Sequence, residues 1–151
     1  MSAATTSAAS AVVLRFADTE ADAAACYELM RQLRPHLATK QEFIVRWQRQ
    51  VAAGYRLLAV WDGREPVALA GFRIQENLVH DRHLYVDDLV TDTDRRSTGH
   101  GRLLMDRLKA EGRALNCAKL ILDTGLNNAL AHRFYYRQGL LATSLRFNTV
   151  L

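Results

Sequence analysis

The sequence predicts one α+β domain, built on a mixed α/β sheet that carries helices on both faces. Its 151 residues suit a single hydrophobic core better than two small ones. Along the chain, the spacing of apolar residues changes repeatedly between a helical period and a strand-like one. The expected order of elements is β-α-α-β-β-β-α-β-α-β, and helices placed between strands in this way cover a sheet on both sides.

The opening residues are predicted to lie outside this domain. The segment Met1 to Ser10 is rich in Ala, Ser and Thr but has neither a basic segment nor an apolar run. These features are typical of a disordered tail and not of a secretory signal. We therefore expect a tail over residues 1–10 and a single domain over residues 11–151.

The domain is expected to begin with a short strand followed by a helix. The segment Ala11 to Phe16 (AVVLRF) predicts the strand. Either Asp18 or Thr19 can cap a helix that runs to about Arg34, before Pro35 ends it. The apolar residues of this helix form one stripe, made of Cys26, Leu29, Met30 and Leu33.

A second helix is predicted immediately afterwards. Thr39 followed by Glu42 is a capping box, the pattern typical of a helix start. Gly54 is well placed to end this helix, because glycine accepts the left-handed backbone that helix ends commonly use. The apolar residues of this helix are Phe43, Ile44, Trp47 and Val51.

Three strands are then expected in succession. The segments Tyr55 to Trp61 and Val67 to Gln75 are apolar and strand-like. The pair Asp62-Gly63 between them is a strong hairpin signal, so these two strands should be antiparallel neighbours. The segment His83 to Thr91 predicts the next strand.

The rest of the chain is expected to alternate between helices and strands. Gly101 to Leu115 has leucines at helical spacing, and Lys119 to Asp123 (KLILD) is a short strand. Asn128 to Gln138 is predicted as a helix and Leu141 to Val150 as the final strand. An apolar last strand would support a homodimer.

Composition limits the classes of function. A formal net charge of +4 favours an anionic ligand. No dense basic run is interleaved with aromatic residues, so we expect no stable nucleic-acid partner. No apolar run approaches the roughly 18 residues that span a bilayer, so we expect no membrane partner. The two cysteines, Cys26 and Cys117, are interpreted as free thiols in a reducing cytoplasm.

A loop with two glycines joins the fourth strand to the third helix. It reads Arg96-Ser97-Thr98-Gly99-His100-Gly101, and the two glycines allow a backbone to approach a ligand closely. The helix that follows offers unpaired N–H groups and the positive end of its dipole, which together bind phosphate. Arg96 adds a forked donor. Taken alone, the loop is equally compatible with a glycine-softened helix start.

Two motifs together resemble the GCN5-related N-acetyltransferase (GNAT) superfamily. The loop Arg96 to Gly101 matches the family signature Arg/Gln-x-x-Gly-x-Gly. The later segment Asn128 to Leu140 is similar to the family pattern N-x-x-A-x-x-F-Y-x-x-x-G-F, with Leu140 replacing the usual aromatic residue. The motifs stand in the family's order, and the resemblance covers nearly the whole chain after the tail. It implies an acetyl-CoA-dependent N-acyltransferase with acetyl-CoA (coenzyme A) as co-substrate.

The resemblance also implies how acetyl-CoA would bind. In such enzymes the fourth and fifth strands separate, and the pantetheine arm lies between them and bonds the fourth strand's backbone. Backbone amides of the loop would hold the pyrophosphate, Asn128 would bond pantetheine, and the small Ala131 would leave room for it. The implied cofactor-binding residues are Leu89, Val90, Thr91, Arg96, Ser97, Thr98, Gly99, His100, Gly101, Asn128, Ala131 and Tyr135.

Tyr135 is the first implied catalytic residue. It aligns with the family tyrosine near the thioester sulfur, and the step to Gly139 selects it over Tyr136. A phenol with a pKa of about 10 can protonate a leaving thiolate. The reaction would be direct attack of a neutral amine on the thioester in a ternary complex. The alternative is that Tyr135 is an ordinary aromatic residue of the helix core.

Asp87 is the second implied catalytic residue. The run Tyr85 to Leu89 resembles the strand of diamine N-acetyltransferases in which an acidic residue faces the acceptor. Strand alternation is expected to put Asp87 on one face with Tyr85 and Leu89, and Asp88 on the other. Asp87 would bind the ammonium group or relay its proton, unless it is only a solvent-facing carboxylate. Asp88 would orient the strand or pair with an arginine. The candidate substrate-binding residues are Asp87, Asp88, Tyr85 and Met30.

The expected acceptor is the primary amine of a small molecule. The acidic pair and the nearby aromatic residues favour a small cationic amine, such as a polyamine or an aminoglycoside. The alternatives are acetylation of a protein N-terminus, a lysine or an aminoacyl-tRNA, and a non-catalytic acyl-CoA-binding module. No His, Cys and carboxylate residues have the spacing of a metal site, so we expect no metal.

Overall fold

The computed structural model describes residues 11–95 and 98–151. The predicted tail over residues 1–10 and the two loop residues Arg96 and Ser97 lie outside the described residues. The elements follow the predicted order as far as the last helix. They are β1 (Val13–Phe16), α1 (Glu20–Leu33), α2 (Lys40–Ala52), β2 (Arg56–Asp62), β3 (Glu65–Asn77), β4 (Asp81–Thr91), the 3-10 turn η1 (Thr93–Arg95), α3 (His100–Ala114), β5 (Lys119–Leu122) and α4 (Ala129–Arg137).

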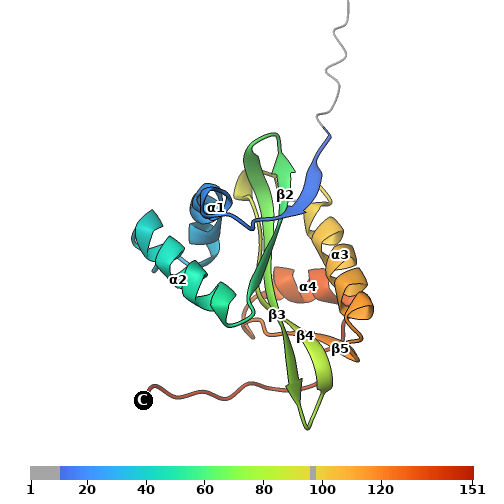
Figure 1. The fold of residues 1–151 in the computed structure, drawn as a ribbon. Coiled ribbons are helices and arrows are strands. Elements are labelled where there is room, and N and C mark those ends of the chain that lie inside the picture. Colours follow the sequence, from blue (N-terminus) through green and yellow to red (C-terminus); the bar gives the residue numbers. More distant parts are fainter. Residues whose placement is uncertain (1–10, 96–97) are drawn as a thin grey trace, which may run out of the picture.

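The strands form one sheet in the order β1-β2-β3-β4-β5. The pairs from β1 to β4 are antiparallel, and β5 runs parallel to β4. Helices α1 and α2 lie on one side of the sheet and α3 lies on the other (Figure 1). The predicted mixed sheet with helices on both faces is therefore confirmed.

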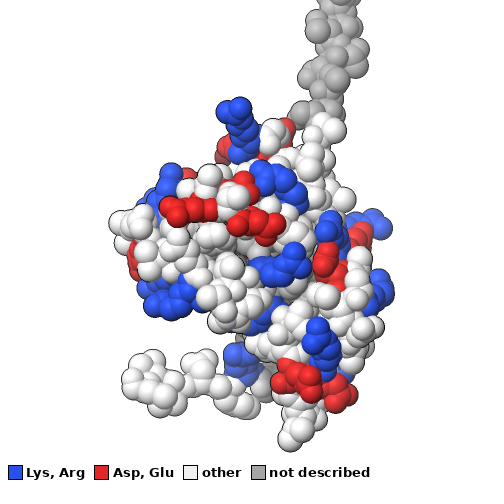
Figure 2. All heavy atoms as spheres, viewed as in Figure 1, with Lys and Arg blue, Asp and Glu red and all other residues white. Residues whose placement is uncertain are grey.

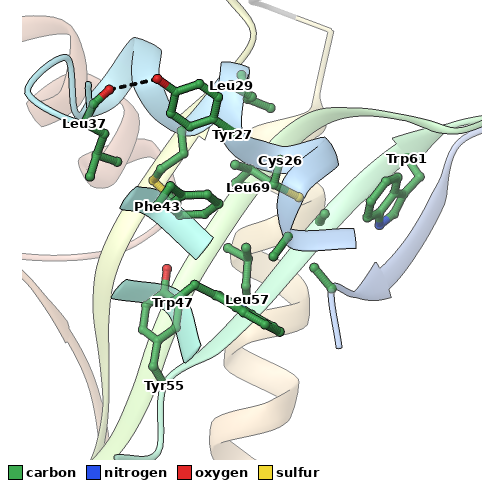
Figure 3. Packing of buried hydrophobic residues seen from close by; sticks show 14 residues of the cluster. Cys26, Tyr27, Leu29, Leu37, Phe43, Trp47, Tyr55, Leu57, Trp61 and Leu69 are labelled. Atoms are coloured by element: carbon green, nitrogen blue, oxygen red, sulfur yellow. Dashed lines mark hydrogen bonds between the residues drawn. The ribbon is translucent and has the colours of Figure 1, made fainter. Parts of the chain in front are cut away.

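Each face of the sheet has its own hydrophobic core. Under α1 and α2, Cys26, Phe43 and Trp47 pack with Leu57 from the sheet (Figure 3). On the α3 side, Leu58 belongs to a second core, which also includes Phe72, Leu84, Leu104 and Leu108. Leu57 and Leu58 separate in this way because successive side chains of a strand point to opposite faces.

The two helices on the first face begin at the predicted caps. Of the two cap candidates for α1, the structure selects Thr19, whose hydroxyl accepts a hydrogen bond from the Asp22 amide at 3.1 Å. Thr39 caps α2 in the same way through the Glu42 amide, also at 3.1 Å. The Glu42 carboxylate turns back to accept from the Ala38 amide at 3.0 Å. These bonds satisfy backbone donors that a helix start otherwise leaves unpaired, and they set where each helix begins.

The predicted final strand over Leu141–Val150 is wrong. Residues 140–151 form no helix or strand, and the segment leaves the domain in an extended path (Figure 1). Leu145 is 64% exposed and Phe147 is 89% exposed. An alternating apolar pattern predicts only that a segment can pair, whereas a strand forms only beside a partner. In the described part of the chain, this segment has no such partner.

Candidate active site

One edge of β4 is left open where the candidate cofactor residues lie. On one edge, β4 pairs with β3 from Asp81 to Thr91, apart from one residue at a bulge. Strand β5 pairs with β4 only from His83 to Val86. Beyond Val86, no described strand pairs with that edge, so the outward-facing backbone groups between Leu89 and Thr91 can bond an extended ligand.

The start of α3 lies next to the end of β4, since a Cβ at Gly101 would lie 3.7 Å from Oγ1 of Thr91. Its N-cap residue is Gly99, which has a φ of +84° and lies in the left-handed region that favours glycine. No side chain bonds the first amides of α3 among the described residues. Before it, the Thr98 hydroxyl donates to the Arg95 carbonyl at 2.6 Å and lies 3.0 Å from Nδ1 of His100. A helix start whose first amides bond no described side chain is suited to an anion.

Gly101 is the point where α3, α4 and β4 meet. A Cβ at this position would lie 3.2 Å from the Phe134 ring and 3.7 Å from Oγ1 of Thr91. The first distance is tighter than most real contacts of a Cβ atom, so the packing of α4 already favours glycine here. The second glycine of the loop motif therefore has a structural role within the protein, besides the close approach to a ligand expected from the sequence.

Helix α4 brings the second motif to the same region. Asn128 is its N-cap, and the Asn128 side-chain oxygen accepts from the Ala131 amide at 3.3 Å. Tyr135 is half-buried, and its ring lies 5.5 Å from the Phe134 ring, centroid to centroid, in an edge-on arrangement. Burial raises the pKa of Tyr135 above its usual value of 10.0. The phenol is therefore protonated at neutral pH, as a proton donor must be.

A β-bulge at Asp87 overturns the expected alternation of β4. Gly71 pairs with Asp88 and Phe72 with Val86, so Asp87 is an extra residue with no opposite partner in β3. A bulge shifts the side chains that follow it by one position. As a result Asp87 and Asp88 line the same cavity, and they do not lie on opposite faces as the sequence predicted.

The cavity lies between β4 and the first two helices and has a volume of about 280 Å³. Of the predicted substrate residues, Met30, Asp87 and Asp88 line it. Tyr85 does not, and its hydroxyl instead bonds the carboxylate of Asp123. Leu37 also lines the cavity, and the Tyr27 hydroxyl donates to its carbonyl at 3.0 Å (Figure 3).

The carboxylate of Asp88 is held by two donors. Oδ2 accepts from the Tyr55 hydroxyl at 2.8 Å, and Oδ1 accepts from Nε of Arg34 at 3.0 Å. Burial and the neighbouring Asp88 raise the pKa of Tyr55 well above its ordinary value, so Tyr55 remains a neutral donor. Gly71 leaves room for this contact, because a Cβ there would lie 1.9 Å from the Tyr55 oxygen. The expected pairing of Asp88 with an arginine is thus observed.

The carboxylate of Asp87 is held by one donor. Its Oδ2 accepts from Nε of Arg73 at 3.0 Å, and Nη2 of Arg73 donates to Gln50 at 3.0 Å. Burial raises the pKa of Asp87, while the Arg73 guanidinium opposes the shift. Among the described residues, no donor bonds Oδ1 of Asp87, so one oxygen remains for a ligand.

Sequence reasoning did not identify Arg34, Tyr55 and Arg73 as site residues. The sequence offers little signal for them, since Arg34 is the C-cap of α1, Tyr55 precedes β2 and Arg73 lies within β3. These three residues come close to Asp87 and Asp88 only in the folded structure.

The described residues give little support for a cysteine nucleophile or a metal site. Burial raises the pKa of the Cys26 thiol to about 12, so Cys26 is not a ready nucleophile. Within residues 11–95 and 98–151, no group of three or more His, Cys, Asp or Glu side chains could hold a metal ion. No helix over the same ranges is long and apolar enough to cross a membrane.

Comparison with known proteins points to acetyl transfer. Residues 21–140 match the sequence profile of the acetyltransferase (GNAT) family. The chain is 31% identical over 110 residues to the uncharacterized N-acetyltransferase YhdJ of Bacillus subtilis, covering 72% of this chain and 77% of that protein.

Solved structures show the same fold. An acetyltransferase of Trypanosoma brucei superposes with a TM-score of 0.78 at 23% identity, over 93% of this chain and 100% of that one. An aminoglycoside N-acetyltransferase in complex with CoA superposes with a TM-score of 0.85 at 13% identity, over 96% of this chain and 97% of that one. At these identities the likeness concerns the fold alone.

Proposed function

This chain belongs to the acetyltransferase (GNAT) family, and we propose that it transfers the acetyl group of acetyl-CoA to a primary amine of a small molecule. The bulge at Asp87 carries this proposal. At the bulge, Asp87 and Asp88 both line a polar cavity. Just beyond it, β5 no longer pairs with β4, so the backbone edge at Leu89–Thr91 is open. A donor thioester and an acceptor amine can thus approach one strand from two sides.

The open edge and the start of α3 fit CoA. In the proposal, backbone groups of Leu89, Val90 and Thr91 bond the pantetheine arm, and the uncapped amides that follow Gly99 hold the pyrophosphate. The side-chain nitrogen of Asn128 extends this contact, since only its oxygen is used in the helix cap. When bound, acetyl-CoA supplies an acetyl group already activated as a thioester.

Asp87 and Tyr135 divide the proton transfers in this proposal. Oδ1 of Asp87 accepts a hydrogen bond from the ammonium group and takes its proton directly or through water. The raised pKa of Asp87 makes it a better acceptor than an ordinary exposed aspartate. Tyr135, kept protonated by burial, donates its proton to the departing thiolate. No covalent acyl-enzyme is required, which agrees with the inert Cys26.

A thiol-release assay tests the proposal. Purified protein is mixed with acetyl-CoA and a panel of small primary amines, and native protein is compared with Tyr135→Phe. We expect CoA release on at least one amine and a kcat about a hundredfold lower in the variant. Binding of acetyl-CoA without turnover on any amine would favour the non-catalytic module. No rise in melting temperature with CoA would refute the cofactor assignment.

The exposed C-terminal segment supports a homodimer as part of this proposal. Residues 140–151 carry a single charged side chain, Arg146, and in Figure 2 the segment is almost entirely without charged groups. Leu141, Phe147 and Val150 are exposed. Such an apolar segment is expected to bury these side chains against a second copy of the chain.

Light scattering after size exclusion tests the dimer. The native chain should run as a dimer and a variant truncated after Leu140 as a monomer, and the double variant Leu145→Glu with Phe147→Glu should also be monomeric. A monomeric native chain at high micromolar concentration would refute this part of the proposal.

A further inference from the structure

We propose that the acceptor carries an oxyanion, a carboxylate or a phosphate, on the same small molecule as its primary amine. This inference rests on the proposed function, because it names the substrate class of the cavity between β4 and helices α1 and α2. It departs from the small cationic amine that the sequence favoured. The cavity has an acidic interior and a basic rim, and the two are exposed to different degrees.

The acidic interior is already neutralised by the protein. Asp88 has a side chain only 14% exposed, and both of its oxygens accept hydrogen bonds, from Arg34 and from Tyr55. Asp87 is 25% exposed and forms an ion pair with Arg73 at 3.0 Å. Of the four oxygens of this aspartate pair, Oδ1 of Asp87 is the one that has no donor within residues 11–95 and 98–151, and it can accept from an ammonium group. The interior can therefore orient one amine but does not attract a molecule with several positive charges.

The rim of the same cavity is basic and more exposed. Arg34 and Arg46 both line it, with side chains 41% and 42% exposed. In Arg34, Nε and Nη2 already bond Asp88 and the Asp87 carbonyl, so Arg46 has more donors left for a ligand. Arg46 uses one nitrogen, Nη2, to bond the Glu42 carboxylate at 2.8 Å, and its other guanidinium nitrogens have no partner among the described residues. A guanidinium with free donors is suited to bind a carboxylate or phosphate through two parallel hydrogen bonds.

Apolar side chains complete the lining of the cavity. Met30, Phe43 and Trp47 line the cavity together with Asp87, Asp88 and Arg46. With a volume of about 280 Å³, the cavity is at the small end of ligand sites and suits a metabolite-sized molecule. A short molecule that carries both an amine and an oxyanion matches these lining groups.

Matched amine pairs test the inference. The probes are O-phosphoethanolamine against ethanolamine, and 4-aminobutanoate against 4-aminobutanamide, with 1,4-diaminobutane as the dication. Thiol release from acetyl-CoA is measured for native protein, Arg46→Gln, Arg46→Lys and Arg49→Gln. Arg49 is the control, because it lies on the same helix, is exposed and does not line the cavity.

We expect kcat/KM for at least one anionic amine to exceed that of its neutral counterpart by about tenfold or more, the usual size of a charge-assisted contact. The preference should disappear in Arg46→Gln, return in part in Arg46→Lys and survive in Arg49→Gln. The phosphate and carboxylate pairs show which oxyanion is preferred. Equal use of both members of each pair, or a preference for 1,4-diaminobutane, would overturn the inference. So would an equal loss in the Arg46→Gln and Arg49→Gln variants.

A binding measurement separates this inference from the proposed function. Calorimetric titration of each amine into protein saturated with CoA needs no turnover. If no amine is acetylated but an anionic amine binds to native protein and not to Arg46→Gln, the substrate class stands and the proposed reaction fails. If amines are acetylated but the anionic ones bind no more tightly than their neutral partners, the reaction stands and the inference fails.

Discussion

The sheet with α1, α2 and α3 and the C-terminal region over residues 123–151 differ in how they are stabilised. The first contains two hydrophobic cores, in which residues such as Leu69, Leu104 and Leu108 are fully buried. The second contains no buried residue: α4 has none, and the segment after it exposes leucine, phenylalanine and valine. Yet the C-terminal region carries Asn128, Ala131 and Tyr135, three of the residues proposed to contact CoA.

This contrast indicates that one region stabilises the fold and the other contributes residues proposed to bind CoA. The sheet and its helices contribute nearly all of the apolar burial, and therefore most of the folding free energy. The C-terminal region has little to stabilise it within one chain. We expect its order to depend on CoA and on a second copy, so that substitutions in the two regions should affect different measurements.

The largest expected effect is on folding and comes from the core. Leu108→Ala removes a fully buried side chain between α3 and the sheet. It should lower the free energy of unfolding by about 3 kcal/mol. Phe147→Ala in the exposed segment should change it by less than about 0.5 kcal/mol when measured at concentrations where the chain is monomeric. Urea unfolding followed by circular dichroism provides both values. Similar losses of unfolding free energy in the two variants would contradict this difference between the two regions.

The next effect is on catalysis and comes from the C-terminal region. Tyr135→Phe should lower kcat about a hundredfold and leave the melting temperature within about 2 °C, because it removes one hydroxyl from a half-buried ring. Since burial raises the pKa of Tyr135, native kcat should fall only above pH 10, where the phenol ionises. The variant should lack this basic limb. An unchanged pH profile in Tyr135→Phe would exclude Tyr135 as the proton donor.

A smaller effect is expected where the two regions meet. Gly101→Ala places a methyl group against Phe134 of α4 and should weaken CoA binding about tenfold by displacing that helix. Gly112→Ala is the matched control in the same helix, because its Cβ would make only ordinary contacts at 3.8 Å. Calorimetry with CoA measures both variants. Equal affinities would show that α4 adjusts without cost.

The smallest effect concerns the caps of the two regions. Thr19→Ala removes the cap of α1, a core helix, and should cost about 1 kcal/mol of unfolding free energy. Asn128→Ala removes the cap of α4 and should leave that free energy within about 0.5 kcal/mol, while raising the KM for acetyl-CoA. Asn128→Asp retains the cap but loses the side-chain amide donor, so it separates the two roles. A normal KM in Asn128→Asp would argue against a contact with pantetheine.

Most of the fold could be predicted from local patterns. The capping box at Thr39, the Asp62-Gly63 hairpin and the change from helical to strand spacing each act over a few residues, and each predicted element up to α4 is present. The loop with Gly99 and the motif around Tyr135 were visible for the same reason. They predicted the family that the sequence comparisons confirm.

The arrangement of the acceptor cavity could not be predicted in the same way. Alternation along β4 separates Asp87 from Asp88, but the bulge opposite Gly71 brings them together, and a bulge depends on how two strands pair. The partners of the aspartates come from distant parts of the chain: Arg34 is the C-cap of α1, Tyr55 immediately precedes β2, and Arg73 lies in β3. No pattern in the sequence near Asp87 predicts these partners.

The sequence by itself therefore determined the elements up to α4, the family and the two motifs that identify it, because these depend on spacing over a few residues. Only the tertiary structure decided that Asp87 and Asp88 share one cavity, that arginines neutralise them, and that residues 141–150 form no strand. These outcomes depend on partners: a carboxylate acquires its charge environment, and a strand its hydrogen bonds, from residues that the fold alone brings close.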